Sequence, residues 1–409
     1  MVTRKLINKL LYILHQHRIF KLINNSSYTF QDEPRFHYYS ALLNEKTSRY
    51  NIKGHRTLID GISLTSSLGG FFRCIANSLA YLSLFYSDSK PIEYFSYTDL
   101  VRKKFPCLLC AKDFLFKKNI LDKDLGWIQG YNFSLDISCG VPAQLIYMNY
   151  LTKMKYEFNR YEPMIIPAFS TGASCGLNHE SAILDGIYSV LERYISFNLI
   201  RDKYNKFAYV KTDESIIHQL IKKFDHFNLD LKIFYLENEL SVPAFLVTLI
   251  DNRGKFPKLT CGIGVGLNHK EAIIRGIEEV YMSRMFLKGC KKSKMISFDL
   301  HSKFVSTYFD LHPLIFSYHL YKKIPKVMQT HRKYITDKNI DQKKELAELS
   351  KIFKKVGYQI IYVNLKSSDY QLNNIPIFIY KTLIKGLKHQ LIESAELRWN
   401  LNELSKCKL

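Results

Sequence analysis

The sequence predicts an α+β protein in which mixed β-sheets are flanked by helices. The first observation behind this prediction is an internal repeat, because GLNHESAILDGIYSV from Gly176 returns as GLNHKEAIIRGIEEV from Gly266. Each copy joins a glycine-containing turn to apolar residues at helical spacing, a pattern typical of a strand, a tight turn and a helix. The second observation is a set of β-branched and aromatic segments that indicate strands, at residues 231–235, 244–250 and 359–364.

The repeated helices carry small residues that predict close packing. Ala182 and Gly186 lie one turn apart on the same face of the first helix, so another backbone can approach it closely. A fainter third copy begins at Gly70, with Ala76 and Ala80 at the matching offsets. We therefore expect three related turn-helix units.

The chain is predicted to have two parts, an N-terminal basic helical segment at residues 1–49 and a larger domain at residues 50–409. In the first 23 residues, Leu6, Leu10 and Leu14 recur at helical spacing, and basic residues interrupt the apolar stretch that an export signal would need. This pattern favours packing on the body of the protein over a membrane surface. Residues 322–344 are charged and weakly periodic and predict an exposed connection, before a helix at residues 343–356.

The basic composition favours an acidic partner, and an AT-rich coding bias toward lysine explains part of the excess. Lysine and arginine number 59 against 37 acidic residues in 409, a formal charge of +22 that suits nucleic acid, anionic lipid, nucleotide or an acidic peptide. Lysines are spread along the whole chain without a nucleic-acid motif, so we expect no nucleic-acid partner. No stretch reaches the ~18 to 20 apolar residues of a membrane span. The eight irregularly spaced cysteines indicate reduced thiols and a cytoplasmic location.

Three kinds of polar group could carry chemistry or only support the fold. A glycine turn before a helix presents free N–H groups to an anion, but close packing explains such a glycine equally well. His179 and His269 begin the repeated helices, where each could contact a phosphate or cap its own turn. Cys107 and Cys110 have a zinc or redox spacing, but without a second pair they favour a half site or structural thiols.

Acids with nearby cations lie on both repeated helices. Arg193 follows Glu192 in the first helix, and Arg275 precedes Glu279 by one turn in the second. Carboxylates on a helix face can hold a metal ion and its phosphates, and guanidinium groups bind phosphate oxygens. The same pairs also occur as ordinary helix salt bridges. Both interpretations stay open from the residues alone.

The segment from Ser170 to Gly176, STGASCG, leads into Glu192 and Arg193 and resembles the signature turn and helix of the YcaO family. Residues 141–147 resemble the strand before that turn, residues 262–279 the family's later motif, and residues 362–365 and 385–387 its closing region. The resemblance covers the chain from about residue 50 onward. It implies the YcaO fold, with three turn-helix units around a nucleotide-type cavity.

The resemblance also implies a function in the biosynthesis of modified ribosomal peptides, such as azole-bearing bacteriocins. Family members bind ATP and magnesium, phosphorylate a peptide amide oxygen, and so close Cys, Ser or Thr side chains into azolines. Carried over by motif, Ser174, Arg193 and Arg275 are expected to bind the nucleotide, and Glu192 and Glu279 to bind Mg²⁺. Expected partners are a precursor peptide and a leader-binding protein or an active YcaO homologue, in a homo-oligomer or a hetero-complex.

Several motif positions depart from the family pattern. The first helix of the family carries a Glu-x-x-Glu-Arg run, and Ser83, Tyr86 and Ser87 occupy those positions here. In the second helix Ser181 and Ser189 replace acids. Two hypotheses follow. The chain is either an ATP-dependent cyclodehydratase with a divergent site, or a non-catalytic YcaO-like subunit that binds precursor peptide or an active homologue.

Overall fold

The computed structural model describes residues 3–26, 29–44, 58–85, 91–106, 121–165, 169–200, 207–212, 214–292, 332–335, 340–365 and 376–387. The chain divides into two compact units. Unit 1 contains Met1–Ser27, His37–Val190 and Gln342–Leu387, and unit 2 contains Tyr28–Phe36, Leu191–Asp341 and Lys388–Leu409. The predicted boundary between residues 49 and 50 lies outside the described residues and stays a prediction.

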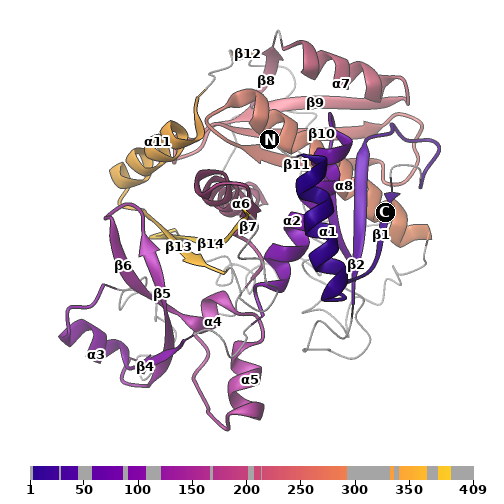
Figure 1. Ribbon diagram of the computed structural model, residues 1–409. Helices are drawn as coiled ribbons and strands as arrows, with labels where there is room; N and C mark the ends of the chain where they lie inside the picture. The colour runs from indigo at the N-terminus through magenta and orange to yellow at the C-terminus, as the bar shows by residue number, and fades with distance from the viewer. Residues whose placement is uncertain are drawn as a thin grey trace, which may run out of the picture. The chain divides into compact units, whose positions relative to one another are not determined.

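Unit 1 contains two antiparallel sheets (Figure 1). The smaller sheet has the order β1-β2-β3, with bounds Phe20–Asn25, His37–Leu43 and Leu58–Ser63. The larger has the order β4-β5-β13-β14-β7, with β6 also paired to β5; the bounds are β4 Glu93–Phe95, β5 Leu125–Asn132, β6 Ile137–Pro142, β7 Ala173–Gly176, β13 Gln359–Asn364 and β14 Phe378–Lys385. The helices are α1 Arg4–Gln16, α2 Ser67–Leu82, α3 Tyr97–Arg102, α4 Ala143–Ile146, α5 Tyr150–Glu157, α11 Gln342–Lys355 and the first half of α6 His179–Ile200.

Unit 2 is built on one sheet in the order β11-β10-β9-β8-β12. Its strands are β8 Phe207–Thr212, β9 Leu229–Leu236, β10 Ala244–Asp251, β11 Leu259–Val265 and β12 Arg332–Ile335, and its helices are the end of α6, α7 Ser215–Asp225 and α8 His269–Lys292. Glycine permits the close approach of α8 to β11, because a Cβ on Gly264 would fall 1.8 Å from the Ala272 carbonyl oxygen. The mixed sheets with flanking helices confirm the predicted α+β class.

The predicted strands and the repeat agree closely with the structure. The segments at residues 231–235, 244–250 and 359–364 lie in β9, β10 and β13, and both copies of the repeat form a strand, a turn and a helix. The N-terminal helix is shorter than predicted, because Arg18 has a φ of 50° and the chain then enters β1. Strand β12 lies within the predicted exposed connection, where it pairs parallel to β8.

The third turn-helix unit differs in its register. Ser66 is the N-cap of α2 and its Oγ accepts a hydrogen bond from Gly69 N at 3.1 Å, so the helix starts before Gly70. A Cβ on Gly70 would fall 2.3 Å from the His37 carbonyl oxygen, which explains a glycine inside a helix. The order of strand, turn and helix is as predicted, but the glycine belongs to the helix.

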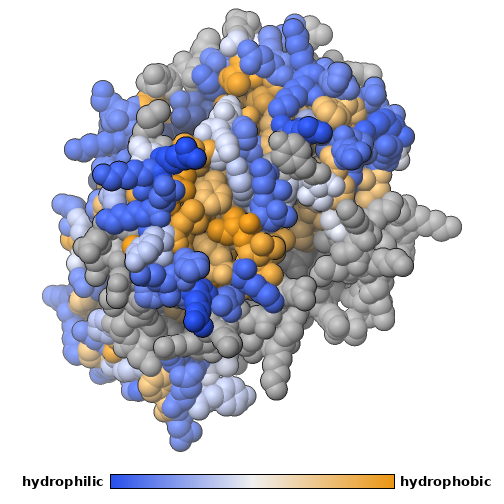
Figure 2. All heavy atoms as spheres, turned by 45° about the vertical axis from the view of Figure 1, so that its right-hand side comes forward, coloured by the Kyte–Doolittle hydropathy of each residue, from blue (hydrophilic) through white to orange (hydrophobic). Residues whose placement is uncertain are grey.

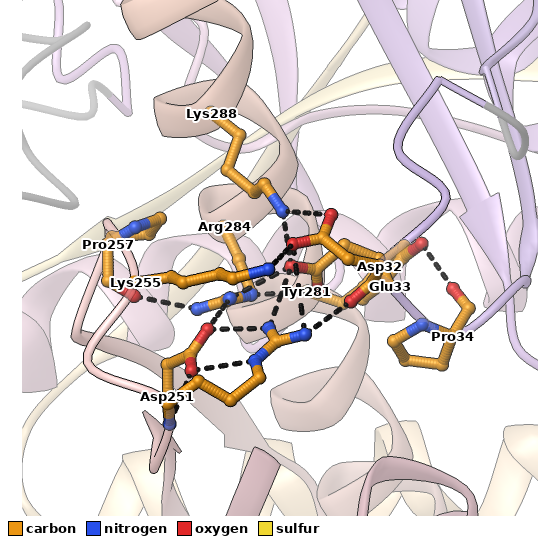
Figure 3. Close-up of polar contacts among 10 residues, drawn as sticks. Asp32, Glu33, Pro34, Asp251, Lys255, Pro257, Tyr281, Arg284 and Lys288 are labelled. Carbon is orange, nitrogen blue, oxygen red and sulfur yellow. Dashed lines mark hydrogen bonds and ion pairs between the residues drawn. The ribbon is translucent and has the colours of Figure 1, made fainter. Parts of the chain in front are cut away.

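A buried network of charges holds α8 in unit 2 (Figure 3). Arg284 Nη2 donates to Asp251 Oδ2 at 2.5 Å and to Glu33 Oε1 at 2.8 Å. Lys288 Nζ donates to Glu33 Oε1 at 2.6 Å and to Asp32 Oδ1 at 2.8 Å. These contacts join residues 32–34 and the end of β10 to the second half of α8. They fix the helix whose first half carries Arg275 and Glu279.

The surface suits a strongly charged chain. Among the coloured residues in Figure 2, hydrophilic ones surround hydrophobic ones gathered near the middle of the view. Across the part of the chain that the structure describes, no helix is both long enough and apolar enough to span a bilayer.

Candidate functional site

The two repeated helices begin in the same way. Asn178 Oδ1 accepts a hydrogen bond from Ser181 N at 2.7 Å, and Asn268 Oδ1 accepts one from Glu271 N at 3.0 Å. Each asparagine therefore caps the first turn of its helix. In the Asn-His pair at the start of each repeated helix, the asparagine therefore has a structural role.

The histidines that follow the caps pack against aromatic rings. His179 Nδ1 is hydrogen-bonded to the Tyr380 hydroxyl, and its ring centroid lies 3.9 Å from that of Phe378. The His269 ring faces Phe245 at 5.8 Å. These contacts give both histidines a packing role on the strand beside each helix.

Arg193 on α6 and Glu279 on α8 interact in unit 2. Glu279 Oε2 accepts a hydrogen bond from Ile263 N at 2.8 Å, which ties the middle of α8 to β11. Burial raises the pKa of Glu279 to about 6, against the opposing effects of the Ile263 N–H and the Arg193 charge. A cation bound beside this carboxylate would favour its ionised form.

Glu192 and Arg275 lie on the same two helices as Arg193 and Glu279, and both are partly exposed. In the described parts of the chain, no three His, Cys, Asp or Glu side chains are grouped so that they could hold a metal ion. Magnesium is commonly held by one or two carboxylates together with phosphate oxygens and waters. The structure brings the Arg193 charge close enough to act on Glu279. The predicted roles of Glu192, Arg193, Arg275 and Glu279 in binding nucleotide and Mg²⁺ stay predictions.

Ser174 lies in β7 of unit 1. Its side chain is buried, and its Oγ donates a hydrogen bond to the Ala182 carbonyl at 2.6 Å. The hydroxyl hydrogen thus ties β7 to the first turn of α6, and only the oxygen lone pairs can accept from a ligand. The predicted contact of Ser174 with nucleotide stays a prediction.

Sequence reasoning missed a buried lysine beside the signature turn (residues 170–176). Lys381 lies in β14, is 2% exposed, and donates to the carbonyl oxygens of Phe169 and Thr171. The available signal was a lysine in the otherwise apolar strand FIYKTLIK. Lysine is almost never fully buried in a protein, so its position in this strand marks an unusual site.

A family model described as YcaO cyclodehydratase, ATP- and Mg²⁺-binding, matches residues 84–387. The chain belongs to the YcaO family. The match includes the signature turn and both repeated helices, and it confirms the family predicted from those motifs.

Solved YcaO structures share the fold. A heterocyclase in complex with substrate and cofactor matches 93% of this chain and 52% of its own, with a TM-score of 0.64 and 15% identity. YcaO from Methanopyrus kandleri bound with AMPPCP and Mg²⁺ matches 95% of this chain and 92% of its own, at 0.60 and 14%. The E. coli microcin synthetase McbBCD complex with pro-MccB17 bound matches 88% and 86%, at 0.58 and 12%. At these identities the likeness shows the YcaO fold.

One curated relative is an uncharacterized protein of Methanothermobacter thermautotrophicus. It is 27% identical over 172 residues, which are 40% of this chain and 42% of that protein. The match thus spans less than half the length of this relative.

The YcaO motif position at Ser83 has a local structural role. Ser83 is the C-cap of α2 and its Oγ donates to the Leu79 carbonyl at 2.8 Å, so the hydroxyl bonds the helix itself. Tyr86, Ser87, Cys107 and Cys110 lie outside the described residues.

Proposed function

We propose that this chain is an ATP-dependent YcaO component that modifies a ribosomal peptide by closing Cys, Ser or Thr side chains into azolines. The observation that supports the proposal is that Arg193 and Glu279, both at motif positions, lie close enough in unit 2 for the guanidinium charge to favour the ionised carboxylate. A nucleotide with its magnesium needs both kinds of group.

Each of these residues has a defined task in the proposal. Arg193 and Arg275 bind phosphate oxygens, because a guanidinium group offers paired N–H donors to an oxyanion. Glu192 and Glu279 would hold Mg²⁺ with their carboxylate oxygens, and Glu279 Oε2 accepts a hydrogen bond from Ile263 N. Bound ATP supplies the phosphoryl group that converts the peptide amide oxygen into a leaving group.

Calorimetric titration of ATP with magnesium tests the proposal. We expect the wild type to bind and the Glu192→Ala and Arg275→Ala variants to bind at least about tenfold more weakly, the loss that about 1.4 kcal/mol produces. Lys270→Ala is the matched control, because Lys270 is on the same helix as Arg275 but pairs with Glu214 at 3.4 Å. The absence of wild-type binding would rule out the ATP-dependent activity.

The alternative is a non-catalytic YcaO-like subunit. Two observations favour this alternative. Ser83 stands where the family has an acid, and its hydroxyl donates to a carbonyl of its own helix. Among the described residues, no three possible ligands are grouped for a metal ion. In this role the chain binds a precursor peptide or an active homologue in a hetero-complex, and the charge of +22 suits an acidic leader segment. Co-purification with an active homologue, without ATP binding by this chain, would support the alternative.

The proposed location is the cytoplasm. Cys74, Cys139, Cys175 and Cys261 are buried as thiols, the state that a reducing compartment maintains. Fractionation of cells that express the tagged chain tests this placement.

A further inference from the structure

Lys381 occupies the interior of the larger sheet of unit 1. It lies in β14, in register with Ala173 of β7 on one side and with Val363 of β13 on the other. Only 2% of its surface is exposed. Burial lowers the pKa of this amine to about 7, because the charged form loses its hydration. Near neutral pH a large share of the amine is therefore uncharged.

The partners of Lys381 are two carbonyl groups of one turn. Its Nζ donates to the carbonyl oxygens of Phe169 and Thr171, in the entry turn (residues 169–173) that leads into β7. An uncharged lysine amine has two N–H donors, which match these two acceptors. The two hydrogen bonds from Lys381 to the entry turn therefore do not require the charged ammonium form of the side chain.

The rest of the entry turn is also bonded inside unit 1. Ala173 N donates to the Ser170 carbonyl at 2.9 Å, and Thr382 N donates to the Gly172 carbonyl at 2.8 Å. With the two carbonyls that Lys381 holds, all four carbonyl groups from Phe169 to Gly172 accept hydrogen bonds from within the unit. Ser170 remains exposed. The turn thus directs its acceptors inward and leaves a hydroxyl group at the surface.

Gly172 shows how closely β14 constrains this turn. It has a φ of 85°, and a Cβ at this position would fall 2.3 Å from the Thr382 carbonyl oxygen. Its N–H donates to Ser189 Oγ on α6 at 3.3 Å. The turn therefore has little freedom while β14 and α6 keep their contacts.

We propose that Lys381 is a positioning residue that fixes the signature turn for nucleotide binding by holding the Phe169 and Thr171 carbonyls. This inference rests on the proposed function. Without the lysine, the Phe169 and Thr171 carbonyls lose their donor, and the turn rearranges until water or another donor reaches them. The fixed position of the exposed Ser170 hydroxyl is then lost, although the sheet itself remains.

Cysteine alkylation tests the structural half of this inference without ATP. Cys175 lies in β7 just after the entry turn, and Cys139 lies in β6 of the same sheet. In the full chain treated with N-ethylmaleimide, peptide mass spectrometry reports the reaction rate of each thiol. Lys381→Met is expected to speed alkylation of Cys175 at least about tenfold and to leave the rate for Cys139 unchanged. A tenfold increase corresponds to a local opening whose free energy is lower by about 1.4 kcal/mol.

Two further variants keep this test decisive. Lys153→Met is the matched control, because Lys153 is another buried lysine of unit 1 and pairs with Glu157 at 3.5 Å. It should leave the Cys175 rate unchanged. Lys381→Arg keeps two donors and should stay within about threefold of the wild type. Equal acceleration of Cys139 and Cys175 in Lys381→Met would show general support of the sheet and overturn the proposal.

The ATP titration tests the functional half. Lys381→Met should weaken ATP binding about tenfold, whereas Lys153→Met should not. Selective exposure of Cys175 with unchanged ATP affinity would overturn the link to nucleotide binding. If the wild type binds no ATP, the proposed function fails, while the alkylation result still decides whether Lys381 positions the turn.

Discussion

Arg284 donates two hydrogen bonds to Glu33, from Nε to Oε2 and from Nη2 to Oε1, each 2.8 Å long. The two side chains are almost completely buried, at 0% and 1% exposure. A bidentate pair of this kind fixes both the distance and the angle between its carriers. Residues 32–34 are therefore joined to α8, the helix that also carries the site residues Arg275 and Glu279.

Replacement of Glu33 should destabilise unit 2 strongly. Glu33→Gln leaves the buried Arg284 and the partly buried Lys288 with less negative charge around them, and the expected loss is about 3 to 5 kcal/mol in the free energy of unfolding. Urea denaturation followed by circular dichroism measures this loss. The exposed pair of Arg102 and Asp99, 3.7 Å apart, supplies the control, because Arg102→Ala should change stability by less than about 0.5 kcal/mol. Similar losses for both variants would contradict the view that burial makes the difference.

Glu279 should make stability depend on pH between about 4.5 and 6. Its pKa in the folded protein is raised to about 6 from 4.5, so the folded state binds more protons than the unfolded state in this window. Stability from this group is present below the window and is lost as pH rises through it. From pH 4.5 to 7 the wild type should lose about 1.5 kcal/mol relative to Glu279→Gln.

The measurement is chemical denaturation of both proteins at the two pH values. Glu279→Gln keeps an oxygen that can accept from Ile263 N, so the comparison isolates the titration. If the two proteins change in parallel with pH, Glu279 titrates in the fold as it does in water, and its burial has no electrostatic effect.

The asparagine caps should have a measurable energy. Asn268→Ala removes the acceptor for Glu271 N at the start of α8 and should cost about 1 kcal/mol. Asn268→Asp keeps an acceptor and adds a negative charge at the positive end of the helix, so it should restore most of that stability. Thermal or urea unfolding of the three proteins tests the order. An alanine variant as stable as the wild type would remove the cap as a reason for this asparagine.

The local sequence pattern predicted the helices and strands whose formation depends on nearby residues. The strands β9, β10 and β13 follow from β-branched and aromatic runs, and α6 and α8 follow from a repeat whose asparagines cap both helices. The end of α1 was missed, because the left-handed φ of Arg18 depends on the path of the chain into β1 rather than on a glycine signal. The register of α2 was missed for a related reason, since Ser66 caps the helix ahead of Gly70.

The polar contacts inside the fold depend on pairs that are distant in the sequence. Nothing in the local sequence of Glu33 indicates that it pairs with Arg284. Glu279 was found as a motif acid, but its bond from Ile263 N and its raised pKa come from the packing of α8 on β11. Lys381 was missed because a lysine inside a strand is usually an exposed or edge residue.

Lys381 should make stability rise with pH above neutral. Its pKa in the folded protein is lowered by burial to about 7 from 10.5, so the unfolded state binds more protons between these values. The cost of burying the charge is largest below pH 7 and declines as pH increases. Between pH 7 and 9 the wild type should gain about 2 kcal/mol relative to Lys381→Met, which lacks the titrating group.

Urea denaturation of wild type, Lys381→Met and Lys153→Met at both pH values measures the difference, and the Lys153→Met protein should keep the rise. Parallel behaviour of wild type and Lys381→Met would mean that the amine stays charged at pH 9, so that its hydrogen bonds to the entry turn are made by an ammonium group.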